Sequence, residues 1–160
     1  MFAFSVFKTL FSTQTWSKQV LTYSIINSSK ELSLDDTKAA FRYGFDQLST
    51  VISKEFIEQR ANSTSDREDI SISFFTPGLN GIGLIVSSSW QESIYFNGNE
   101  KWKKYIIGEK VDPKQRDITW EAMNQILNLF KIDGLPNSDK ISLDAKYSDS
   151  NGNYVLPKYV

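Results

Sequence analysis

Cysteine and histidine are both absent from this chain of 160 residues. The lack of cysteine excludes disulfides, thiolate metal sites, iron–sulfur clusters and cysteine nucleophiles. The lack of histidine excludes Ser–His triads, histidine general bases and imidazole metal ligands. A large excess of charge of one sign is also lacking, since 18 Lys and Arg residues against 19 Asp and Glu residues give a net charge of −1. We therefore expect no nucleic-acid partner, and what remains is carboxylate or lysine chemistry, a calcium site with oxygen ligands, or no catalysis.

Ordinary globular composition is present, with 40% hydrophobic and 14% aromatic residues, and the length is typical of a single domain. No segment approaches the ~20 apolar residues of a membrane-spanning helix, so we expect no transmembrane segment. Residues 1–15 do not fit a secretory signal, because Lys8 interrupts the apolar run and no cleavage site is clear. We predict that they form an aromatic arm that packs on a domain of residues 16–160, or an amphipathic arm that contacts a membrane or partner. The arm carries Phe2, Phe4, Phe7 and Phe11.

Hydrophobic periodicity predicts the order strand, helix, several strands, helix, which indicates an α+β fold or an α/β fold with a mixed sheet. Strands are predicted at residues 20–26, 55–59, 69–74, 83–88 and 93–96. The first helix begins at Ser33, with Asp36 completing a capping box. The second spans residues 117–131 and is capped by Asp117 or Thr119. The inward faces are predicted to be Leu34, Phe41, Phe45 and Leu48 on the first helix, and Ile118, Met123, Ile126, Leu127 and Phe130 on the second.

Four local strings occur in the order and near the spacing of a known family. They are Trp-Ser-Lys at residues 16–18 with Leu-Thr-Tyr-Ser-Ile-Ile-Asn at 21–27, Ala-Phe at 40–41, Asp-Ile-Ser-Ile-Ser-Phe at 69–74, and Tyr-Phe-Asn-Gly-Asn-Glu-Lys-Trp at 95–102. Through them residues 16–147 resemble the catalytic domain of the matrixins, the matrix metalloproteases of the metzincin clan. The resemblance implies a zincin-like α+β fold with a twisted mixed sheet of about five strands and two long helices. The family's C-terminal helix is expected to be missing.

The catalytic motif of an active matrixin is His-Glu-x-x-His-x-x-Gly-x-x-His on the second helix. Residues i and i+4 lie on one helical face, so two imidazoles reach one zinc, and the Glu is the general base. When Ala122 is set against the Ala that precedes the motif, its slots are taken by Met123, Asn124, Leu127, Phe130 and Asp133. Of these only Asp133 could coordinate, and a catalytic zinc needs three protein ligands. The resemblance therefore implies a matrixin scaffold with a vestigial zinc motif.

The other metal sites implied by the resemblance are also altered. The histidine slots of the family's structural zinc fall near Val86 and at Tyr95. The family's calcium string has two Asp where this chain has Asn97 and Asn99, whereas Glu100 is retained. An amide oxygen brings no charge, so weaker calcium binding is expected. We therefore expect no resident metal and no cofactor.

Two further groups could carry function. The carboxylates are Glu55, Glu58, Asp66, Glu68 and Asp69, which we interpret as solvated charge. The basic-aromatic cluster is Lys101, Trp102, Lys103, Lys104 and Tyr105, which is either an exposed face or a partner patch. Leu84, Trp102 and Tyr105 are the candidate binding residues. Residues 149–153 lack the glycine position and the final Glu of a calcium loop, so we predict a turn.

Three functional hypotheses follow. The first is a catalytically inactive matrixin-like domain that binds a protein or an extended peptide beside an edge strand. The second is a structural or self-assembling protein held by its sheet edges and aromatic arm. The third is a residual carboxylate hydrolase, which ranks last. The resemblance suggests an extracellular origin, because the family is mostly extracellular.

Overall fold

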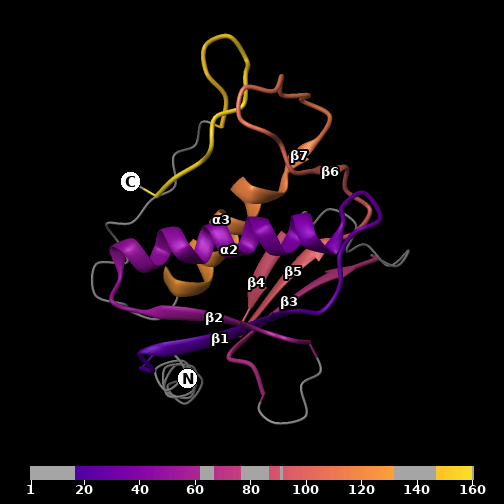
Figure 1. Ribbon diagram of the computed structural model, residues 1–160. Coiled ribbons are helices and arrows are strands. Elements are labelled where there is room, and N and C mark those ends of the chain that lie inside the picture. Colours follow the sequence, from indigo (N-terminus) through magenta and orange to yellow (C-terminus); the bar gives the residue numbers. More distant parts are fainter. Residues whose placement is uncertain (1–16, 62–66, 77–86, 91, 132–146, 160) are drawn as a thin grey trace, which may run out of the picture.

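The computed structural model describes residues 17–61, 67–76, 87–90, 92–131 and 147–159 (Figure 1). The aromatic arm predicted at residues 1–15 and its boundary with the domain lie outside these residues, as does Leu84. The elements are β1 (Val20–Ile25), α2 (Leu34–Val51), β2 (Glu55–Gln59), β3 (Ile70–Phe75), β4 (Ser87–Trp90), β5 (Ser93–Asn97), β6 (Trp102–Lys103), β7 (Arg116–Asp117) and α3 (Ile118–Lys131).

Five strands form one mixed sheet in the order β2-β1-β3-β5-β4. The first four are parallel, and β4 pairs antiparallel with β5 at the edge. Residues of β3 alternate between the core and the half-exposed face, as period-two patterning requires, with Ile70, Ile72 and Phe74 buried. The predicted α+β class with a mixed sheet and two long helices is confirmed.

The predicted strand at residues 83–88 is only partly matched. The structure begins β4 at Ser87 and continues it to Trp90, while residues 77–86 lie outside the described part. Sequence patterning also missed β6 and β7, which pair parallel through two residues each. A two-residue strand is too short to carry a hydrophobic period, so no pattern could have predicted this pair.

Helix α2 begins where its sequence predicts. The Ser33 hydroxyl oxygen accepts a hydrogen bond from the Asp36 amide at 3.0 Å and donates one to the Asp36 carboxylate at 2.8 Å. The expected inward position of Leu34 is wrong, since 43% of this residue is exposed. Leu34 is the first residue of the helix, and the buried face begins only at Thr37.

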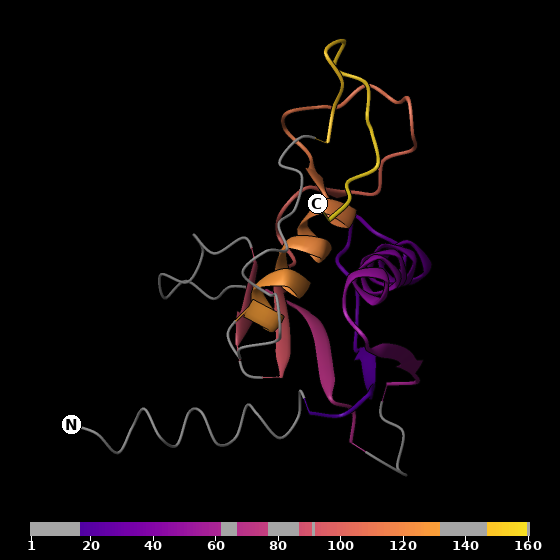
Figure 2. The ribbon, with the colours of Figure 1, turned by 90° about the vertical axis from the view of Figure 1, so that its left-hand side faces the viewer.

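Both helices lie on one side of the twisted sheet, and α3 packs between α2 and the strands β4 and β5 (Figures 1 and 2). The two helices approach closely at Gly44, where an added methyl carbon would lie 2.8 Å from Cδ1 of Ile126. Every inward residue predicted for α3 is buried. None of the helices in the described part is both long and apolar enough to cross a bilayer.

A further group of segments lies mostly at the top of Figures 1 and 2, beyond the N-terminal end of α3, and its last residues run back to the two helices. We call it the upper lobe and define it as residues 101–117 and 147–159. An antiparallel bridge between Lys110 and Asn153 joins its two parts, and the rings of Tyr105 and Tyr154 stack with centroids 5.4 Å apart. The described residues 147–159 contain no helix.

The turn predicted at residues 149–153 is confirmed. The Asp149 carboxylate accepts hydrogen bonds from the backbone amides of Asn151 and Asn153, at 2.8 and 2.9 Å. Gly152 follows with φ of +75°, a conformation that side chains disfavour. All of these bonds are local, so the carboxylate stabilises the turn.

Candidate functional site: the motif face of α3 and the edge of β4

Helix α3 begins at a buried carboxylate. Oδ1 of Asp117 accepts a hydrogen bond from the Thr119 amide at 3.2 Å, and Oδ2 accepts one from the Trp120 amide at 3.0 Å. Asp117 is therefore the N-cap, and Thr119 lies inside the first turn. The Tyr154 hydroxyl also donates to Oδ2 at 2.9 Å. Burial raises the pKa of Asp117, although these three hydrogen bonds act in the opposite direction.

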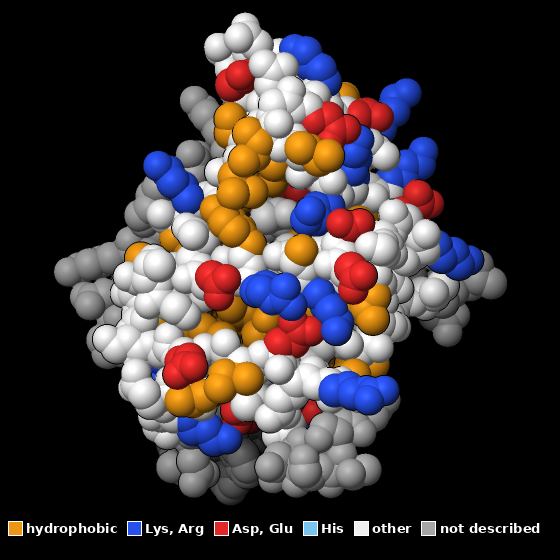
Figure 3. Space-filling model, viewed as in Figure 1, with side chains coloured by type: hydrophobic (Ala, Val, Ile, Leu, Met, Phe, Trp, Pro, Cys, Tyr) orange, Lys and Arg blue, Asp and Glu red, His pale blue; other side chains and the backbone are white. Residues whose placement is uncertain are grey.

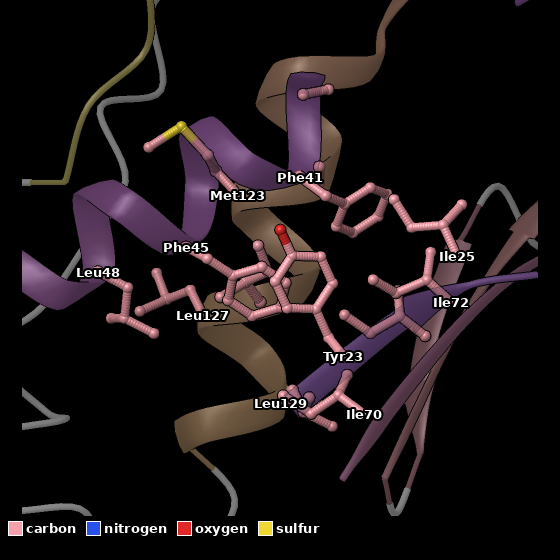
Figure 4. Packing of buried hydrophobic residues seen from close by; sticks show 14 of the residues in the cluster. Tyr23, Ile25, Phe41, Phe45, Leu48, Ile70, Ile72, Met123, Leu127 and Leu129 are labelled. Atoms are coloured by element: carbon pink, nitrogen blue, oxygen red, sulfur yellow. The ribbon is translucent and has the colours of Figure 1, made fainter. Parts of the chain in front are cut away.

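Met123 and Leu127 are the two positions that the resemblance sets against the first two histidines of the zinc motif. They are one helical turn apart, so they share a face of α3, and both are buried. Met123 is 0% exposed, and its Cγ lies 3.3 Å from the position of a methyl carbon added at Gly44. Figure 4 shows Leu127 next to Phe45 and Leu48, whereas the Met123 side chain extends along α2 away from the strands, and both belong to the hydrophobic core cluster. The structure therefore places these two positions in the core.

The remaining motif positions differ. Asn124 is half-buried, Phe130 is buried, and Asp133 lies outside the described residues. A thioether and an alkyl group supply no nitrogen or oxygen donor, so Met123 and Leu127 do not fit a zinc ion of the family's type. Among the described residues no group of three or more Asp and Glu side chains is placed to hold a metal ion.

The C-terminal segment covers this part of the molecule through three tyrosine hydroxyls. Tyr159 donates to the backbone carbonyl of Met123 at 2.8 Å, and Tyr43 donates to the carbonyl of Pro157 at 2.9 Å. The third bond is donated by the Tyr154 hydroxyl to Asp117, the cap of α3. Together these bonds attach residues 154–159 to both helices. Burial raises the pKa of Tyr159, so its hydroxyl remains a neutral donor. The sequence analysis did not predict that this segment packs on the helices. The available signal was the presence of three tyrosines in the tail, at residues 147, 154 and 159.

Asn97, Asn99 and Glu100, the positions set against the family's calcium-binding string, lie at the turn between β5 and β6. Oδ1 of Asn97 accepts from the Asn99 amide at 2.9 Å, and the Asn97 carbonyl accepts from the indole nitrogen of Trp102 at 2.7 Å. Glu100 accepts from Nε of Arg116 at 2.9 Å. A methyl carbon added at Gly98 would lie 3.2 Å from the Phe75 carbonyl oxygen, so the turn also lies close to β3.

Two of the three candidate binding residues have little exposed surface. Trp102 and Tyr105 are buried, and the Tyr105 hydroxyl both donates to the Asp112 carbonyl and accepts from the Asp112 amide. Neither ring presents a face to a partner. Segments distant in the sequence cover these rings: Tyr105 stacks on Tyr154, and Trp102 contacts the rings of Phe74 and Phe96. In the same cluster Lys101 is exposed, whereas Lys103 pairs with Glu109 and Lys104 with Asp36.

Two of the candidate carboxylates, Glu58 and Asp69, have structural partners. Glu58 pairs with Lys38 and Arg42, whose nitrogens lie 3.1 and 2.8 Å away. Asp69 accepts from Lys18 and from the Thr22 amide, the latter at 2.9 Å. Burial alone would raise the pKa of Asp69, but these bonds lower it. Glu55 is exposed, Glu68 is half-buried, and Asp66 lies outside the described residues.

Strand β4 is the edge strand of the described sheet next to this site. It pairs with β5 on one side, and no described strand lies on its other side. Helix α3 packs against β4, so the open edge runs beside the helix that carries the motif positions. An edge strand exposes unpaired backbone groups that can pair with an extended peptide.

Comparison with known proteins gives two findings. A family model described as Matrixin matches residues 15–115, and the match ends before α3 begins. The protein named Matrix metalloproteinase-C of Caenorhabditis elegans is 30% identical over an alignment of 154 residues, and the alignment covers 89% of this chain and 26% of that protein. The chain thus spans about a quarter of the length of that relative.

Proposed function

The chain belongs to the matrixin family, and we propose that it is a member that has lost zinc-dependent peptide hydrolysis and acts by binding. One observation carries the proposal: Met123 and Leu127, the positions set against two zinc ligands, pack in the hydrophobic core against α2. Asn124, set against the catalytic Glu, has an amide that cannot accept a proton as a general base. No catalytic step is therefore assigned to this chain.

The proposed ligand is an extended peptide segment of a partner protein. It would add to the sheet at the open edge of β4, where backbone groups give affinity and neighbouring side chains give specificity. Such binding needs no metal ion, because its hydrogen bonds come from the strand. The mixed sheet supports this mode, because β4 is the edge strand of its described part and pairs there with β5 alone.

Assembly through the sheet edges is the competing function, and the described residues favour it less. The other edge strand, β2, carries Glu55 exposed and Glu58 in two ion pairs. A like charge facing its own copy disfavours edge-to-edge pairing. Sedimentation over a range of concentrations separates the two functions, because binding to a different protein does not require self-association.

The proposal is tested with an array of random 12-residue peptides, followed by hydrogen exchange on the complex of the full chain with each binder. We expect binders to protect backbone amides of β4 and to remain uncleaved when zinc is added. A matched control is β2, whose amides are expected to keep their exchange rates. Protection confined to β2, absence of any binder, or zinc-dependent cleavage would contradict the proposal.

A further inference from the structure

Two neighbouring isoleucines stand out at the surface of the upper lobe. Ile106 is 73% exposed and Ile107 is 68% exposed, the largest values among the exposed large hydrophobic residues of the described part. They lie in a tight turn that is closed by a 2.9 Å hydrogen bond from the Glu109 amide to the Ile106 carbonyl. Gly108 supplies the φ of +86° that the turn requires. The turn is thus a defined structure that presents two aliphatic side chains to solvent.

The C-terminal segment adds two more exposed aliphatic residues beside this turn. The Gly108 amide donates to the Tyr154 carbonyl at 2.9 Å, and the Tyr154 amide donates to the Glu109 carbonyl at 2.6 Å. Val155 and Leu156 follow directly, at 36% and 39% exposed. We call Ile106, Ile107, Val155 and Leu156 together the apolar tip. Figure 3 shows hydrophobic side chains gathered along the upper part of one face, with both basic and acidic side chains around them.

The upper lobe is basic although the whole chain is not. It contains seven Lys and Arg and four Asp and Glu, a net charge of +3, whereas the other residues hold 11 and 15 and carry −4. Three of its acidic groups are already engaged: Glu109 pairs with Lys103, Asp149 accepts from its own turn, and Asp117 is buried. The lysines that are exposed and without an ion-pair partner among the described residues are Lys101, Lys110, Lys114 and Lys158.

We propose that the apolar tip is a docking surface for a membrane that contains anionic phospholipid. Aliphatic side chains on a projecting turn can enter the interfacial region of a bilayer, and nearby lysines gain from the negative surface potential. A soft lipid surface accepts a convex turn without a matching pocket, which a folded protein partner would have to supply. The opposite charge of the remaining residues orients the molecule, with the upper lobe toward the membrane.

The inference is independent of the peptide-binding proposal, because β4 contributes nothing to it. It also differs from the expectation set by the net charge of −1, which averages a basic lobe with an acidic remainder. The excess of positive charge comes from residues 101–117, because residues 147–159 hold one lysine and one aspartate.

The test is co-sedimentation of the full chain with phosphatidylcholine vesicles prepared with and without phosphatidylserine. We expect binding to the vesicles that contain phosphatidylserine, and weaker binding as salt is added. The double variant Ile106→Ser/Ile107→Ser should lower the partition coefficient by at least about tenfold, because it removes two aliphatic groups from the interface. Lys110→Gln/Lys158→Gln should lower it by roughly tenfold, since each lysine adds to the electrostatic attraction.

The matched control is Val51→Ser/Ile57→Ser, which removes two exposed aliphatic residues from α2 and β2. We expect this variant to bind vesicles as the wild type does and all variants to unfold at similar temperatures. Failure of the wild type to bind phosphatidylserine vesicles would overturn the inference, and so would equal loss of binding in the control. Self-association that is lost in Ile106→Ser/Ile107→Ser would also overturn it, because the tip would then be covered by a second copy.

Discussion

The hydroxyl of Tyr154 donates a 2.9 Å hydrogen bond to Oδ2 of Asp117, the buried residue that caps α3. This bond joins a residue of the C-terminal segment to the start of the helix that carries the motif positions. It links two segments 37 residues apart in the sequence, and both partners are buried. The start of α3 and the C-terminal segment are therefore joined by this side-chain pair, in addition to the hydrogen bond from Tyr159 to Met123.

Removal of this hydroxyl should destabilise the protein. In Tyr154→Phe the Asp117 carboxylate keeps its two backbone amides but loses one donor, at a cost of about 1.5–3 kcal/mol for a hydrogen bond to a charged group. Urea unfolding monitored by tryptophan fluorescence measures this change. Tyr95→Phe is the matched control, since Tyr95 is half-buried and should change the free energy of unfolding by less than about 0.5 kcal/mol. Equal effects of the two variants would contradict the role of this bond.

Asp117 should also give a pH dependence of a definite sign. Because burial raises its pKa, the folded state binds a proton more tightly than the unfolded state. The stability of the wild type relative to Asp117→Asn should therefore increase as the pH falls from neutral toward about 4, the ordinary range of an aspartate. Unfolding of both proteins across this range measures the difference. A difference that shrinks or stays constant would show that the carboxylate is not penalised by burial.

The pH dependence of stability is expected to have the opposite sign at Asp69, because hydrogen bonds from Lys18 and Thr22 lower the pKa of this carboxyl despite its burial. This carboxylate stabilises the folded state above its ordinary pKa, and the contribution is lost as the pH falls through the lowered value. Asp69→Asn should thus cost about 1 kcal/mol at neutral pH and progressively less below about pH 4. The same unfolding series, run with Asp117→Asn, tests the two opposite slopes in one experiment.

Several features could be predicted from sequence because their causes are local. Ser33 and Asp36 are three residues apart and make their own cap, and the alternation from Ile70 to Phe74 is sufficient to predict a half-buried strand. The burial of Trp102 could not be predicted in this way. It depends on aromatic contacts with Phe74 and Phe96, which belong to two other strands. A tryptophan among lysines has the same local pattern whether or not distant segments cover it.

In the candidate site, too, some features could be predicted from local sequence and others depend on contacts between distant segments. The i, i+4 spacing of Met123 and Leu127 correctly predicts that they share one face. The sequence does not indicate that Tyr159 reaches the Met123 carbonyl, because that contact joins segments 36 residues apart. The order of strands in the sheet, and so the position of β4 at the edge of its described part, likewise depends on pairing between distant strands.

The close contact between α2 and α3 predicts a cost for any side chain at Gly44. In Gly44→Ala the new methyl carbon would lie 2.8 Å from Cδ1 of Ile126, so the end of that side chain must shift within the packed core. Overpacking of about 1–3 kcal/mol should outweigh the gain of about 1 kcal/mol in helix propensity. The free energy of unfolding of Gly44→Ala, compared with Gly44→Ala/Ile126→Val, measures the effect. Partial recovery in the double variant is expected, and no recovery would place the strain elsewhere.

The proposed loss of zinc chemistry is the central claim, and the zinc content of the purified full chain tests it most directly. The protein should be incubated with excess zinc, dialysed and analysed for metal alongside an active matrixin treated identically. We predict zinc far below one ion per chain, because Met123 and Leu127 offer no donor and are packed in the core. Retention of one zinc ion per chain, together with cleavage of a peptide substrate, would contradict the account.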